Sequence, residues 1–171
     1  MGLFRPLRAD EIECRIGTVS QKGKGLSLLL YKNARTDADI LDETFGPFGW
    51  QCDFSEAKGT LFCRVGIRNA ASDDWVWKED AGAPSNMEAA KGEASDAFKR
   101  ACFKWGIGRE LYTAPFIWVP TEKCNLVDRN GKWVCYDTFD VAKIAIEDGR
   151  ITGVRIVNRK TGQVAFSWKE E

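Results

Sequence analysis

Residues 91–108, KGEASDAFKRACFKWGIG, place apolar side chains at the three- and four-residue spacing of an amphipathic α-helix. With the residues just before this stretch, the apolar positions are Met87, Ala90, Ala94, Ala97, Phe98, Ala101 and Trp105. Because alanine is small, an alanine-rich side lets a helix lie close against a sheet. Gly106 is placed to end the helix in the left-handed conformation.

The opposite side of the predicted helix is charged. Its charged residues are Glu93, Asp96, Lys99, Arg100 and Lys104. Residues 91–109 hold five basic and two acidic side chains, whereas the whole chain has 25 basic and 25 acidic residues. The positive charge is therefore a local feature and not that of a polycation.

Short strand patterns separated by turn signals fill most of the remaining sequence. Helices are expected over residues 9–16, ended by Gly17; over 37–45, capped by Thr36; and after a capping box formed by Ser85 and Glu88. Strands are expected over 26–31, 50–55, 61–68, 75–80 and 116–120, in a hairpin around the Asn130-Gly131 turn, and as three strands within 141–168.

These elements predict an α+β fold, in which an antiparallel β-sheet meander packs on one long helix. This β-β-β-α core is followed by extra C-terminal β-hairpins. A single domain is expected over residues 1–171, with its core over about 9–113 and a C-terminal β extension over about 115–171. The apolar fraction of 44% and the seven tryptophans indicate a folded core, in which most of the tryptophans are expected to lie.

The composition excludes several classes of chemistry. The chain has six cysteines and no histidine, and no cysteine pair has the C-x-x-C spacing, so the usual zinc patterns and histidine catalysis are excluded. The cysteines are expected to be buried, reduced thiols. Without an apolar run long enough for a membrane span or a signal peptide, the protein is expected to be soluble and cytoplasmic.

Two basic segments are candidates for phosphate binding. One is the helix with Lys99 and Arg100, and the other is the flexible loop QKGKG at 21–25, in which Lys22 and Lys24 alternate with glycines. Exposed aromatic rings could add base stacking. The alternative for both segments is ordinary solvated surface, and a stripe forms only if they converge in the fold.

An enzymatic alternative rests on the segment DFSEAK, residues 53–58. Asp53, Glu56 and Lys58 loosely resemble the acidic-x-Lys signature of metal-dependent nucleases, but the segment has the pattern of a tight hairpin. No Walker-type G-x-x-x-x-G-K-[ST] loop and no G-x-G-x-x-G after a strand is present, so an ATP-driven recombinase is not expected and no cofactor is predicted.

The order of motifs resembles the Rad52 single-strand annealing family, and most closely its short bacteriophage branch of Sak-like recombinases. The resemblance rests on FGPFGWQCDF at 45–54, the strand pattern after it, WKEDAG at 77–82 and KGEASDAFKRACFKWGIGRELY at 91–112. It covers residues 9–113. It implies assembly into a ring of many subunits, with single-stranded DNA held in a positively charged outer groove and annealed without ATP.

The resemblance also implies which residues contact DNA. Lys99 and Arg100 match the paired basic residues of the groove-lining helix, and Arg15 matches an arginine of the N-terminal segment that faces the same groove. The further basic residues proposed for DNA contact are Lys22, Lys24, Lys91, Lys104 and Arg109. Where family members often have another helix cation, this chain has Phe103, with Lys104 next to it.

The sequence therefore predicts a non-enzymatic, phage-encoded protein that binds single-stranded DNA and anneals complementary strands in recombination and repair. Its expected partners are single-stranded DNA, further copies of itself, and an exonuclease or the host single-strand-binding protein, with no membrane. Three alternatives stay open: a protective single-strand binder without annealing activity, a metal-dependent nuclease, and a purely structural oligomer. The role of the strands within 136–168 is also open.

Overall fold

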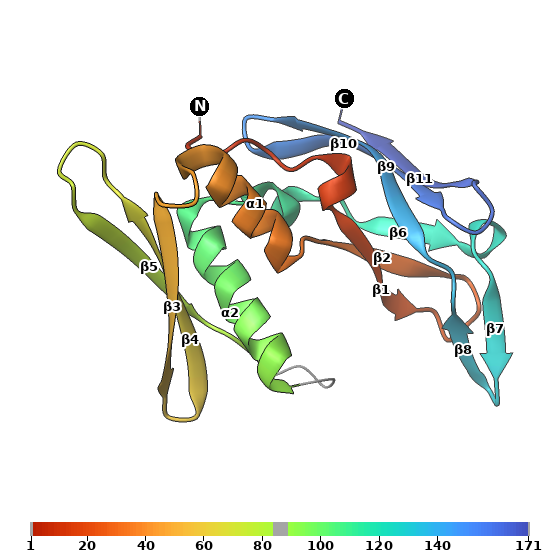
Figure 1. The fold of residues 1–171 in the computed structure, drawn as a ribbon. Helices are drawn as coiled ribbons and strands as arrows, with labels where there is room; N and C mark the ends of the chain where they lie inside the picture. Colours follow the sequence, from red (N-terminus) through yellow and green to blue (C-terminus); the bar gives the residue numbers. More distant parts are fainter. Residues whose placement is uncertain (1, 84–88, 171) are drawn as a thin grey trace. The chain divides into compact units, whose positions relative to one another are not determined.

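The computed structural model describes residues 2–83 and 89–170, and the side chains of 89–91 are outside the description (Figure 1). The chain divides into two compact units. Unit 1 consists of Met1–Arg5 and Asn33–Gly108, and unit 2 of Pro6–Lys32 and Arg109–Glu171. Unit 2 is therefore built from two segments that flank the main segment of unit 1, Asn33–Gly108, in the sequence.

Unit 1 contains a three-stranded antiparallel sheet with β4 in the middle. Its elements are α1 (Ala34–Phe45), β3 (Trp50–Ala57), β4 (Thr60–Arg68), β5 (Trp75–Ala81) and α2 (Ala89–Trp105). Helix α2 packs on β4 and β5, as Figure 1 shows. The side chains that β4 turns toward the helix include Cys63, Val65 and Ile67, which are buried, whereas Arg64 on the other face is exposed.

Helix α2 turns its small side chains toward the sheet, as its sequence pattern predicts. Ala97 and Ala101 are completely buried. Gly82, directly after β5, lies so close to the helix that a Cβ added there would be 2.2 Å from the Glu93 carbonyl oxygen. Gly106 has a φ of +115° and ends the helix as expected. The predicted capping box at Ser85 and Glu88 lies outside the described residues.

Helix α1 begins three residues earlier than expected. The Asn33 side chain accepts a hydrogen bond of 3.0 Å from the Thr36 backbone N–H, so Asn33 and not Thr36 is the N-cap. Thr36 is buried inside the first turn, and Ile40 and Leu41 form the buried side of the helix. The predicted cap was wrong because Asn33 and Thr36, three positions apart, both have side chains that can accept such a bond.

Unit 2 contains a six-stranded antiparallel sheet of order β11-β10-β9-β1-β2-β6 and a separate β7–β8 hairpin. The strands are β1 (Glu13–Val19), β2 (Gly25–Tyr31), β6 (Ile117–Pro120), β7 (Leu126–Arg129), β8 (Lys132–Cys135), β9 (Phe139–Glu147), β10 (Arg150–Asn158) and β11 (Val164–Lys169). Residues of the two edge strands, β11 and β6, contact each other, so the sheet is strongly curled. Its largest fully buried side chains are Leu26, Ile117, Ile151, Ile156, Val119 and Asn158.

The helix expected over residues 9–16 is not formed. A short 3-10 helix, η1 (Ala9–Glu11), is followed directly by strand β1. Cys14 and Ile16 alternate with the exposed residues Glu13 and Arg15, which is the two-residue period of a strand. The long pairing of β1 with β2 decides the outcome, because it satisfies the backbone of both segments.

A buried polar network holds the start of the C-terminal segment in unit 2. The buried carboxylate of Asp137 accepts hydrogen bonds of 2.8 Å from the Asn125 backbone N–H and from the Asn158 side-chain amide. Asn158 in turn accepts a bond from the Lys160 backbone N–H. Since buried polar groups are costly when left unpaired, this network fixes how the chain enters β9 and leaves β10.

The α+β class with antiparallel sheets is confirmed, and two features of the architecture differ from the expectation. The described residues form two helices of more than ten residues instead of one, and two larger sheets instead of one.

The tryptophans were expected mostly in the core, but all seven are half-buried or exposed. An indole N–H needs a partner, and Trp50 and Trp105 donate to Asp42 and to the Val65 carbonyl oxygen. Among the described residues, no helix is long and apolar enough to cross a membrane.

None of the six cysteines forms a disulfide, and their burial differs from the expectation at four positions, because Cys14, Cys124 and Cys135 are only half-buried and Cys52, on β3, is exposed. Cys63 and Cys102 are buried. A hydrogen bond from Cys63 lowers the pKa of Cys52 to about 7, against the opposing effects of burial and of Asp53. Burial raises the pKa of Cys14 to about 12 and that of Cys124 to about 11.

We therefore predict that Cys52 reacts first with iodoacetamide. Its alkylation rate should rise with pH and be half-maximal near pH 7, because the thiolate is the nucleophile. Mass spectrometry of the labelled peptides measures this rate, and the Cys52→Ser variant serves as the control. Faster labelling of Cys14 or Cys124 would contradict the described packing of these strands.

Candidate nucleic-acid interface

Helix α2 carries three of the predicted DNA contacts outside its buried alanine side. Arg100 and Lys104 are exposed, and Lys99 is half-buried. The completely buried residues Ala97 and Ala101 flank Lys99 and Arg100 in the sequence, so the rotation of the helix is fixed by its packing. The structure thus brings Lys99, Arg100 and Lys104 together on one element of unit 1.

Asp80, on β5, lies beside two of these cations. Its carboxylate is 3.7 Å from Arg100 Nε and 3.6 Å from Lys104 Nζ. The Lys104 amine also donates a hydrogen bond of 2.6 Å to the Glu79 carbonyl oxygen. Lys104 is therefore bound to the neighbouring strand, while no acidic partner of Lys99 is found in the described part of the chain.

Glu93 and Asp96, which the sequence placed on the charged side of the helix, are bonded to the sheet. The Glu93 carboxylate accepts a hydrogen bond of 3.1 Å from the Leu61 backbone N–H, and Asp96 accepts one of 3.0 Å from that of Ala83. Both acids thus join the first turns of α2 to the sheet. The C-terminal half of the helix is left with the exposed positive charge.

Arg15 lies on β1 in unit 2, on the outer face of the curled sheet. Its guanidinium is 4.9 Å from the centre of the Tyr31 ring and 3.3 Å from the Glu13 carboxylate. The same sheet exposes Phe116 by 76% and Trp118 by 37%, and these two rings are stacked with centres 6.4 Å apart. The structure therefore shows an aromatic surface that the sequence analysis did not identify.

This aromatic surface follows from strand alternation. Ile117 and Val119 on β6 are buried. Trp118 on the same strand, and Phe116 directly before it, therefore point outward. Ser27 pairs with Trp118 in the register of β2 with β6, and Tyr31 lies further along the same strand. The alternating apolar pattern of FIWVP contained this signal, but the pattern alone could not distinguish a fully buried strand from one with an exposed aromatic side.

Lys22 and Lys24 are exposed in the turn between β1 and β2, and this turn is held in place. Gln21 exchanges two hydrogen bonds with the backbone of Trp133 on β8, and the Trp133 ring packs against Gly23. The loop expected to be flexible is therefore attached to a neighbouring hairpin. Its two lysines project from a fixed backbone.

The last two predicted contacts lie in different surroundings. Arg109 is exposed at the start of the short 3-10 helix η2 (Arg109–Thr113) in unit 2. Lys91 belongs to the first turn of α2, and its side chain lies outside the description. The predicted residues thus form two sets, one on α2 in unit 1 and one on unit 2.

The acidic residues of the nuclease alternative do not converge. Asp53 pairs with Arg64 on the outer face of the β3–β4 sheet, at 2.8 Å. Glu56 is three residues away on the same strand and therefore points to the opposite face. No group of three or more metal-ligating side chains is found among the residues that the structure describes.

Comparison with known proteins identifies the family. The sequence profile of the Rad52/22 family of double-strand break repair proteins matches residues 1–131. This chain belongs to that family. The matched range includes all of α2 and the β1–β2 hairpin, and hence every residue predicted to contact DNA, but it ends before β8.

One curated relative is similar over much of the same length. The single-stranded DNA-binding protein DdrA of Deinococcus deserti is 32% identical over 119 residues. The match covers 68% of this chain and 58% of DdrA, so the chain spans less than two thirds of that relative.

The different contacts of Lys104 and Lys99 predict different effects of removing their charge. Lys104→Met should lower the free energy of unfolding by about 1 kcal/mol. It removes the hydrogen bond to the Glu79 carbonyl oxygen and one of the two cations beside the Asp80 carboxylate. Lys99→Met, the matched control on the same helix, should change it by less than about 0.5 kcal/mol. Urea unfolding followed by tryptophan fluorescence measures both values. An equal or larger loss for Lys99→Met would contradict the described contacts.

Proposed function

We propose that this protein binds single-stranded DNA and anneals complementary strands without ATP, as a non-enzymatic protein of recombination and repair. The observation that carries the proposal is the pair Lys99 and Arg100 on the outward side of α2, in a chain that belongs to the Rad52/22 family. The relative DdrA is named a single-stranded DNA-binding protein, which supports the same ligand.

The geometry of α2 suits contacts with a DNA backbone. Lys99 and Arg100 extend from a helix whose rotation is fixed, so their charges are presented in a defined direction. The ion pair of Arg100 with Asp80 is long and its arginine is half-exposed, and such surface pairs contribute little energy. Arg100 can therefore exchange this carboxylate for a phosphate at low cost.

Unit 2 offers a different kind of contact to the same ligand. Arg15, Tyr31, Phe116 and Trp118 combine a cation with exposed rings on the outer face of one sheet. Aromatic rings stack on unpaired bases with about 1–3 kcal/mol per base and tolerate any sequence. The proposed role of this surface is to hold the bases of a single strand, with Lys22 and Lys24 at the far end of the same hairpin.

Non-catalytic, ATP-independent action is supported by the residues themselves. The sequence lacks the glycine-rich loops that bind nucleoside triphosphates, and Asp53 and Glu56 point to opposite faces of β3. Annealing requires only that two strands be held with their bases accessible, and backbone contacts achieve this without reading sequence.

Assembly into a ring is proposed from strand β3. This strand lies at the edge of its sheet, and its residues 51–57 are all exposed, including the apolar side chain of Phe54. An edge strand with unpaired backbone groups is a surface onto which a second copy can add. Ring formation would place one α2 helix per subunit along a continuous DNA path, although the chain has no net charge.

The first experiment measures annealing of two complementary labelled oligonucleotides without ATP, together with binding to one of them at several salt concentrations. In the double variant Lys99→Gln/Arg100→Gln, the slope of log affinity against log salt should fall by about 1.4, because each lost contact with a single-strand phosphate reduces it by about 0.7. Annealing should slow in parallel. The control is Arg35→Gln/Arg68→Gln, which removes the same charge from other exposed positions of unit 1.

The outcomes separate the alternatives. Equal losses in the two double variants would show that net charge, and not α2, governs binding, and would overturn the proposal. Tight binding without annealing would indicate a protective single-strand binder. Magnesium-dependent strand cleavage that disappears in Glu56→Gln would indicate the nuclease.

We also propose that the two units act as one domain over residues 1–171. The chain crosses between the units at three points, after Arg5, after Lys32 and after Gly108, so neither unit is one continuous segment that could separate by opening a single connection. Thermal unfolding should then show one transition with the same midpoint by circular dichroism and by tryptophan fluorescence. Two separated midpoints would contradict a single cooperative domain.

A further inference from the structure

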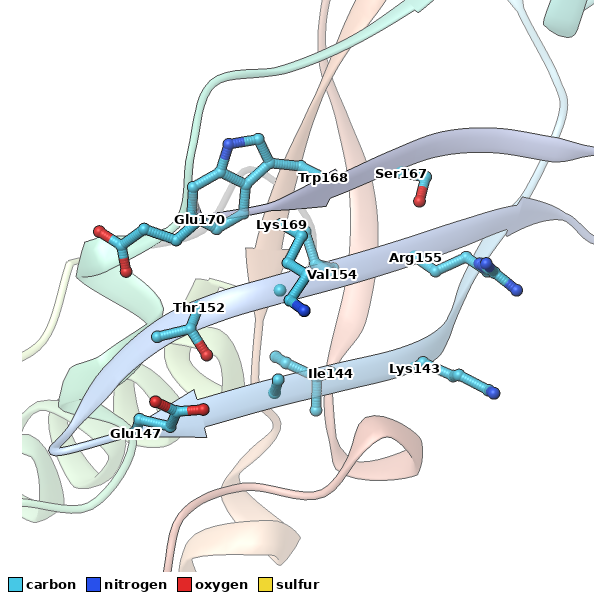
Figure 2. Close-up of a pocket in the computed structure, with 12 residues that line it drawn as sticks. Lys143, Ile144, Glu147, Thr152, Val154, Arg155, Ser167, Trp168, Lys169 and Glu170 are labelled. Atoms are coloured by element: carbon cyan, nitrogen blue, oxygen red, sulfur yellow. The ribbon is translucent and has the colours of Figure 1, made fainter.

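A groove lies on the outer face of strands β9, β10 and β11, in unit 2 (Figure 2). Its volume is about 580 Å³. The side chains that β9 contributes to this face are Lys143, Ala145 and Glu147, and those of β10 and β11 include Arg155, Ser167 and Lys169. We call this feature the C-terminal groove. It lies beyond residue 131, where the match to the family profile ends.

Three cations of the C-terminal groove are gathered on neighbouring strands. Arg155 is directly opposite Lys143 on one side and Ser167 on the other, and Lys169 is opposite Gly153, two residues along β10. In Figure 2 the Lys143 and Arg155 side chains extend in the same direction from their strands. Like charges directly opposite each other on paired strands destabilise a sheet. This arrangement therefore costs the folded protein free energy in the absence of an anion.

The cations of the groove are not neutralised within the described residues. No ion pair there involves Lys143, Arg155 or Lys169, whereas the nearby Arg159 pairs with Asp140 and Arg150 is 4.0 Å from Glu170. The acidic residues of the groove, Glu147 and Glu170, lie toward the β9–β10 turn end. The groove thus has a basic end with a serine hydroxyl, and an acidic end that is partly paired.

Small residues form the floor of the groove. Gly153 pairs with Ala145, and a Cβ added at Gly153 would be 3.5 Å from the Ala145 Cβ, which is ordinary contact. Neither packing nor a left-handed backbone therefore requires glycine at this position. Because glycine inside a strand costs about 0.5–1 kcal/mol relative to alanine, its presence favours close approach of a ligand to the backbone.

We propose that the C-terminal groove is a second binding site for single-stranded DNA, in which Lys143, Arg155 and Lys169 contact backbone phosphates. An extended polyanion fits the three cations because they lie on three adjacent strands, and strand spacing of about 4.8 Å spreads them across the groove. The site adds to the surface on α2, and it rests on the proposed function for the identity of its ligand. It gives the C-terminal strands a role in holding a DNA segment.

The test places a photo-crosslinking amino acid, p-benzoylphenylalanine, at Ser167 of the full chain and illuminates it with an end-labelled oligonucleotide. A crosslink at Ser167 that disappears at high salt is expected. The same amino acid at Thr161, an exposed turn residue between β10 and β11, is the positional control and should give little crosslink.

The triple variant Lys143→Gln/Arg155→Gln/Lys169→Gln should lose the Ser167 crosslink and reduce the salt slope of binding by about 2. Its control, Arg129→Gln/Lys132→Gln/Lys160→Gln, removes the same charge elsewhere in unit 2 and should retain the crosslink.

A second measurement guards against a loss caused by misfolding. Arg155→Gln alone should raise the Tm, because it relieves the repulsion with Lys143, and should nevertheless weaken the crosslink. A structural role for Arg155 predicts the reverse change in Tm.

The outcomes distinguish this inference from the proposed function. If the protein binds DNA and loses affinity in Lys99→Gln/Arg100→Gln but never crosslinks through Ser167, the second site is overturned and the first stands. If no DNA binds to the protein in any form, both proposals fail. If a poly-glutamate peptide suppresses the crosslink at lower concentration than unlabelled DNA, the groove belongs to an acidic protein segment, and the proposed ligand is wrong.

Discussion

The close approach of Gly82 to helix α2 is the constraint on which the candidate interface in unit 1 depends. A Cβ at this position would be 2.2 Å from the Glu93 carbonyl oxygen and 3.0 Å from the Ala97 Cβ, so a larger residue would push the helix away from the sheet. With glycine present, the helix backbone and the end of β5 are in contact. The alanine side of α2 must therefore face the sheet, and Lys99 and Arg100 must lie outside that buried contact.

The charged residues of α2 reinforce this position. Glu93 and Asp96 each bind a backbone N–H at the margin of the sheet, and Lys104 binds a carbonyl oxygen of β5. These bonds satisfy backbone groups that would otherwise lack partners at the end of strands. Two acids and one base of α2 therefore attach the helix to the sheet. The charge that remains available to a ligand belongs to Lys99 and Arg100.

Local signals in the sequence predicted the elements that depend on them. The hairpin at Asn130-Gly131 forms where expected, because residues with positive φ define a turn without help from the rest of the chain. Residues 9–16 could not be assigned correctly in the same way. Their strand is stabilised by pairing with β2 and by a contact with β9, more than a hundred positions later, which no short window contains.

The same distinction applies to the candidate site. The outward direction of Lys99 and Arg100 could be predicted, because helical periodicity is a property of neighbouring residues. The attachment of Lys104 to Glu79 could not, because it joins a helix to a strand 25 positions earlier. The aromatic surface was missed for a related reason. Whether Phe116 and Trp118 are core or surface depends on which face of the curled sheet is covered, and that is decided by strands from both ends of the chain.

The neutral composition of the chain does not argue against binding a polyanion, because its charges are sorted by their partners. Asp53, Asp73 and Asp140 are each paired with an arginine in the structure. Lys99 on α2 has no such acid among the described residues, and neither do the cations of the C-terminal groove. Charges separated by more than about 10 Å are largely screened at moderate ionic strength, so a phosphate senses only those near it. What decides binding is then where unpaired cations are gathered, and a net charge of zero is compatible with two strongly basic surfaces.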